Sequence, residues 1–150
     1  MNIVDIKNIF EEAAARHKDI ESFDLGLNYQ EGERGNAKYP QLFFETDFTC
    51  IEEDKVFSYG ISIAMFVRIT QNANRTEKLE NLSVAETYIR DVIDWIRENY
   101  GSTMWITYDY NYLTFYDITT DKVDGLRVEM TVNVAKTNCD IDDKFGAPTF

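Results

Sequence analysis

Few residues in this chain have the type and spacing that catalysis or metal binding requires. His17 is the one histidine, and it falls at the end of a predicted helix, where a positive or polar side chain caps the helix dipole. No nucleophile motif accompanies it, so we expect a capping or surface role. Cys50 and Cys139 are far apart and form no C-x-x-C pair, which predicts two free thiols in a reducing compartment.

The carboxylates are numerous but form no complete motif. Asp140, Asp142 and Asp143 have the spacing of a calcium loop, yet its glycine and final glutamate are missing. Residues 52–54 (E-E-D) fit the solvated tip of a turn, and G-E-R-G at 32–35 lacks the helix and the Lys-Ser or Lys-Thr of a phosphate loop. We therefore assign no catalytic, metal-binding or cofactor-binding residue and expect no enzyme activity. A small hydrolase with paired carboxylates stays as an alternative that rests on their number alone.

Aromatic side chains gather in the stretch W-I-T-Y-D-Y-N-Y-L-T-F-Y-D, residues 105–117. Aromatics that stack on nucleic-acid bases need cations nearby, but the charges here are Asp109 and Asp117. A tyrosine-rich protein–protein surface fits better, with ordinary core and surface positions or a carbohydrate site as alternatives. The candidate interface residues are Trp105, Tyr108, Tyr110, Tyr112, Tyr116, Phe43 and Phe150.

The chain has 150 residues and a net charge of -12, a length that fits one domain able to bury a core. An aromatic content of 14% argues against disorder despite this charge. Phosphates repel so acidic a chain, so specific nucleic-acid binding is not expected; mimicry of DNA, or a channel wall along which DNA slides, would use the same charge. The N-terminus does not resemble a signal peptide, and no apolar run is long enough to span a bilayer.

Two helices are predicted from apolar residues at helical spacing. The first covers residues 3–17 with Asn2 as its N-cap. The second starts at an S-x-x-E capping box formed by Ser83 and Glu86 and ends at Gly101, while residues 71–81 are predicted to be a surface loop.

Six strands are predicted from alternating apolar residues, at 23–27, 41–50, 57–69, 104–108, 113–115 and 126–134. Pro40 lies at the start of the second strand, a position where a sheet tolerates proline. The alternation places the apolar Phe43 on the otherwise polar side of that strand. The order α-β-β-β-α-β-β-β predicts an α+β fold, a mostly antiparallel sheet of five to six strands with both helices on one face. We expect residues 1–136 to form a single domain and residues 137–150 a tail that orders only on assembly.

The first helix ends in H-K-D-I-E-S-F at 17–23, and a Y-P pair at 39 and 40 opens an apolar strand. A long strand ends in V-R-I-T, and after an asparagine-containing loop comes S-V-A-E-T-Y-I-R-D-V-I-D-W-I at 83–96. Together with the order of elements over residues 1–135, these local features resemble the tail-terminator and neck proteins of tailed bacteriophages, in the type found in crAss-like and other Bacteroidetes phages.

The resemblance implies a structural virion protein, a ring-forming subunit of the head–tail connector or tail terminator. Its partners would be copies of itself and other neck or tail proteins, with DNA passing through the ring without specific binding and with no membrane contact. It would be located in the virion, and in the host cytoplasm during assembly. The alternative is an acidic DNA mimic, or another binding protein, that inhibits a host factor.

Overall fold

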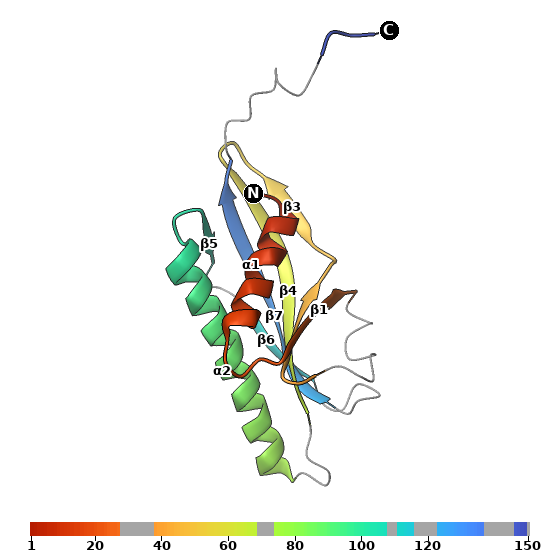
Figure 1. The fold of residues 1–150 in the computed structure, drawn as a ribbon, viewed down its shortest axis with the longest axis vertical. Helices are drawn as coiled ribbons and strands as arrows, with labels where there is room; N and C mark the ends of the chain where they lie inside the picture. The colour runs from red at the N-terminus through yellow and green to blue at the C-terminus, as the bar shows by residue number, and fades with distance from the viewer. Residues whose placement is uncertain (28–37, 69–73, 108–110, 116–122, 137–145, 150) are drawn as a thin grey trace.

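The computed structural model describes residues 1–27, 38–68, 74–107, 111–115, 123–136 and 146–149. These residues form an α+β fold in which two helices pack on one face of a mixed sheet of seven strands (Figure 1). In chain order the elements are α1 (Ile3–Arg16), β1 (Ser22–Gly26), β2 (Gln41–Glu45), β3 (Thr49–Glu52), β4 (Val56–Arg68), α2 (Arg75–Tyr100), β5 (Met104–Ile106), β6 (Asn111–Phe115) and β7 (Val123–Ala135).

The long strands β4 and β7 pair antiparallel over their full lengths and form the centre of the sheet. The order across the sheet is β1-β2-β4-β7-β5, with β3 also on β4 and β6 also on β7. The expected sheet of five to six mostly antiparallel strands is therefore too small by at least one strand, and β1 runs parallel to β2. Alternation in a sequence shows which side chains share a face, but it does not give strand direction.

The predicted second strand is divided into β2 and β3, which pair one after the other with β4. Phe44 lies opposite Ile63 and Thr49 lies opposite Gly60, so four residues on one side face two on the other. This bulge contains two extra residues, an even number, so Cys50 still faces the same side of the sheet as Phe44.

The strand β2 begins directly after a cis peptide bond between Tyr39 and Pro40. Pro40 has no N–H to donate, but its carbonyl accepts hydrogen bonds from the backbone N–H groups of Glu21 (2.8 Å) and Ser22 (3.4 Å). The residue that lacks a donor thus attaches the start of β1 to the sheet.

The predicted C-terminal ends of both helices agree with the structure, but the predicted start of α2 is wrong. Asn2 caps α1 and forms a capping box with Asp5, and Gly101 is the C-cap of α2. However, α2 begins at Arg75 with Asn74 as N-cap, so Ser83 lies inside the helix and most of the predicted loop is helical. Periodicity detects a helix only where one face is buried, and the first buried residue of α2 is Leu82.

The main core lies between the helices and the sheet, and a second, smaller cluster lies on the opposite face of the sheet. The second cluster consists of Phe43, Ala64, Phe66 and Val123, with Tyr39 at its edge. Phe43 is 2% exposed, which corrects its assignment to a polar side. Gly125 makes this packing possible, because a Cβ there would lie 2.7 Å from both the Met65 carbonyl oxygen and Cδ1 of Phe66.

Candidate functional site

The face of the sheet opposite the helices, called the far face below, carries the polar groups that sequence reasoning did not connect. Residues directly opposite each other in antiparallel strands project to the same side, so the strand register defines this face. Around its middle it presents Thr49 and Ile51 of β3, Ser58, Gly60 and Ser62 of β4, Glu129, Thr131 and Asn133 of β7, Trp105 of β5 and Leu113 of β6.

Arg127 organises an ion-pair cluster at one end of this region. Its Nε donates to Oε2 of Glu45 at 2.6 Å, and its Nη2 donates to Oε1 of Glu45 and to the hydroxyl of Ser62, both at 3.0 Å. Nη1 donates to Glu129 at 2.5 Å. The Glu45 side chain is 3% exposed, whereas that of Glu129 is 55% exposed. The hydrogen bonds with Glu45 raise the pKa of Arg127 above its ordinary value, so this guanidinium stays charged.

Asn133 organises a second polar cluster farther along β7. Its side-chain oxygen accepts a hydrogen bond from Ser58 (2.8 Å), and its nitrogen donates to Oγ1 of Thr107 (3.0 Å) and to the carbonyl of Trp105 (3.3 Å). One amide therefore links β4, β7 and the β5 segment, and it fixes the backbone that carries Trp105.

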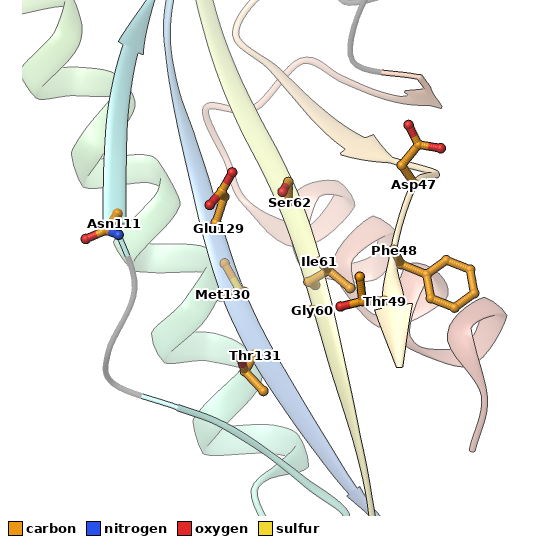
Figure 2. A pocket seen from close by; sticks show the side chains of 10 residues that line it. All are labelled: Asp47, Phe48, Thr49, Gly60, Ile61, Ser62, Asn111, Glu129, Met130 and Thr131. Carbon is orange, nitrogen blue, oxygen red and sulfur yellow. The ribbon is translucent and has the colours of Figure 1, made fainter. Parts of the chain in front are cut away.

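A shallow hollow of about 480 Å³ lies between the two clusters, with the helices behind it (Figure 2). Gly60 leaves room for the Thr49 side chain on β3, because a Cβ at that position would lie 2.4 Å from Oγ1 of Thr49. The polar side chains around the hollow are Asp47, Thr49, Ser62, Asn111, Glu129 and Thr131. Its carboxylates and hydroxyls suit hydrogen-bond donors and cationic groups.

His17 takes the structural position predicted for it. It is the C-cap of α1, and its Nδ1 accepts a hydrogen bond from the backbone N–H of Asp19 (3.1 Å). Nε2 lies 2.9 Å from a carboxylate oxygen of Asp91 on α2, and the imidazole packs edge-on against Tyr88. Because Nδ1 accepts a hydrogen bond, Nε2 carries the hydrogen and donates to Asp91, so the imidazole of His17 links α1 to α2.

The structure disperses the predicted interface residues that it describes. Trp105 is 46% exposed on the far face, and Tyr112 is half-buried on β6 below the guanidinium of Arg90. Phe43 is enclosed in the second cluster. Tyr108, Tyr110, Tyr116 and Phe150 lie outside the described residues, as do Cys139 and the aspartates at 140, 142 and 143.

The Arg127–Glu45 pair is the feature that sequence reasoning missed. The two residues are separated by 82 positions, and each looks like an ordinary polar residue in an alternating strand. The available signal was their opposite charge on the same predicted face of two strands. Strand register, which the sequence does not supply, was needed to bring them together.

No protein-family model matches this chain, and no curated protein matches it with significant sequence similarity. Among the described residues, no group of three or more His, Cys, Asp or Glu side chains is arranged to hold a metal ion. Neither α1 nor α2 is both long enough and apolar enough to cross a membrane.

Proposed function

We propose that this protein is a structural subunit of a bacteriophage virion, forming a ring at the neck or tail as a tail terminator or head–tail connector, without catalysis. The observation that carries the proposal is the exposure of large apolar side chains on the far face of the sheet. Trp105 on β5 and Leu113 on β6 are each nearly half exposed there, and the helices cover the opposite face. The two side chains lie opposite Asn133 and Arg127, six positions apart along β7, so each offers a separate apolar contact to a partner protein.

The acidic charge supports the same role. In a ring, carboxylates that line the passage would repel DNA and let it slide without binding. The resemblance of local sequence features to phage neck and tail proteins points in the same direction.

The test is the mass of the protein in solution, measured by light scattering and native mass spectrometry, alone and mixed with the neck and tail proteins of the same phage. We expect a closed ring, or incorporation into one, and we expect Trp105→Asp to weaken it. Leu79→Asp, at an apolar position on α2 that is 67% exposed against 46% for Trp105, is the control and should leave assembly unchanged. A protein that remains a monomer and never joins particles would refute the proposal. Absence from virions together with tight binding to a basic host enzyme would favour the DNA mimic instead.

A further inference from the structure

The edges of the sheet differ in how well side chains protect them. In β1 the hydrogen bond from Thr46 N–H to the Gly26 carbonyl (2.8 Å) shows that Gly26 and Asp24 face β2, so Leu25 faces outward. The outward N–H of Leu25 is occupied by the carboxylate of Asp24 at 2.9 Å. Natural proteins protect edge strands in this way against unwanted pairing.

The edge at β5 is also occupied. Thr107 N–H donates to the Thr131 carbonyl at 3.0 Å, so Thr107 and Trp105 face β7 and Ile106 faces outward. The outward carbonyl of Ile106 accepts a hydrogen bond from the guanidinium of Arg97 at 3.4 Å.

The outer edge of β3 has no such protection from the described residues. The hydrogen bond from Glu53 N–H to the Val56 carbonyl (2.9 Å) sets the alternation, so Thr49 and Ile51 face β4 while Cys50 and Glu52 face outward. Within the described part of the chain, no residue bonds to the outward backbone groups of Cys50 and Glu52, and β3 pairs with β4 alone.

The side chains of this edge are apolar on both faces of the sheet. Phe48, just before β3, is 44% exposed and packs against the ring of Tyr59 on the helix side, with centroids 6.0 Å apart. Ile51 is 63% exposed and projects from the far face. A strand added here would bury apolar surface on both sides while it makes backbone hydrogen bonds.

Charge determines which kind of strand fits. The residues from Asp47 to Asp54 include four carboxylates and no cation, and one of the four, Glu52, is paired with Lys136 at 2.8 Å. A second copy paired antiparallel through β3 would bring two such acidic segments together, which is unfavourable. The chain's own residues 137–150 contain three aspartates and one lysine, so they are repelled as well.

We propose that the outer edge of β3 binds an extended segment of a partner protein by strand addition, and that this segment has apolar residues at its centre and lysine or arginine at its ends. The inference does not depend on ring formation.

The test uses a short acetylated peptide that alternates valine and threonine between lysine and arginine ends, and a matched peptide with glutamate in place of the cations. We expect the basic peptide to bind at least about tenfold more tightly than the acidic one, and to slow amide hydrogen exchange at Cys50 and Glu52 by at least about tenfold. Exchange at Thr49 and Ile51, whose N–H groups already bond to β4, should not change.

Two variants locate the binding. Cys50→Pro removes an outward backbone N–H donor without removing a β3–β4 hydrogen bond. Ile51→Lys adds a positive charge to the edge of β3. Each variant should weaken binding of the basic peptide at least about tenfold. The control is Leu79→Lys, which makes the same charge change at a position on α2 that is 67% exposed and should bind normally. If Cys50→Pro fails to fold, Ile51→Lys decides. Unslowed exchange at Cys50 and Glu52 under saturating peptide, or equal binding of the acidic peptide, would overturn the proposal.

Discussion

Replacing Arg127 with methionine should destabilise the protein severely, because it leaves the carboxylate of Glu45 buried without its partner. Among the described residues, Arg127 is the only donor to that carboxylate, through two hydrogen bonds of 2.6 and 3.0 Å. Hydrogen bonds to charged groups are worth roughly 1.5–3 kcal/mol each. Breaking a buried pair by removing one partner costs roughly 3–5 kcal/mol, and we expect Arg127→Met to fall in that range.

The measurement is urea-induced unfolding at neutral pH, followed by circular dichroism. The matched control is Glu129→Gln, which removes a carboxylate that bonds to the same guanidinium from an exposed position. It should cost less than about 1 kcal/mol. The double variant Glu45→Leu with Arg127→Met removes both charges and should recover most of the stability, since replacing a buried pair by apolar groups is often close to neutral.

The reasoning fails if Arg127→Met costs no more than Glu129→Gln. It also fails if the losses from the two single variants, Glu45→Leu and Arg127→Met, simply add in the double variant. Additivity would mean that the two side chains are energetically independent.

Three further predictions concern the helix start, the second cluster and the link between the helices. Asn74→Ala should cost about 1 kcal/mol in unfolding free energy because it removes the N-cap of α2. Ser83→Ala lies inside the helix and should change the unfolding free energy by less than about 0.5 kcal/mol. Equal losses would indicate that α2 begins at Ser83 and not at Arg75. Gly125→Ala should cost roughly 1–3 kcal/mol in unfolding free energy, because the added Cβ overpacks against Phe66. Gly146→Ala is the control and should have no effect, because nothing lies within 4 Å of the added Cβ. A Gly125→Ala protein as stable as the parent would contradict the close contact between Gly125 and Phe66. The hydroxyl of Tyr100 on α2 donates to Glu12 on α1 at 2.6 Å and lowers the pKa of that carboxyl, so this hydrogen bond stabilises the fold above pH 4.5 and the stabilisation is lost as the pH falls through the lowered pKa. Tyr100→Phe should therefore reduce the loss of unfolding free energy in acid. An unchanged dependence of stability on pH would argue against the bond.

Much of the fold could be predicted from the sequence because most of its elements contribute one face to the main core. The alternation in β4 and β7 and the apolar stripe of α1 are consequences of packing against that core, so composition and period reveal them. The prediction failed where that condition is absent. The first turns of α2 are solvated and have no apolar stripe, and Phe43 lies in a second cluster on a face expected to be polar.

The candidate site was harder to predict, because it depends on which strands are neighbours. Glu45 and Asn133 acquire their roles only when β2, β4, β7 and β5 lie side by side in a definite register. The outward direction of the Cys50 and Glu52 backbone groups likewise follows from the pairing of β3 with β4. Hydrophobic pattern indicates sidedness, whereas register comes from contacts between distant segments.

The bulge between β2 and β3 restricts how this part of the chain can change in length during evolution. Losing both surplus residues, or gaining two more, would leave each side chain of Thr49–Glu52 on the same face of the sheet. Losing or gaining one would turn that strand over, exchanging the sides that Cys50 and Ile51 occupy. Relatives that keep this sheet should therefore show insertions and deletions here in steps of two residues, and an odd step would indicate that the edge strand had been remodelled.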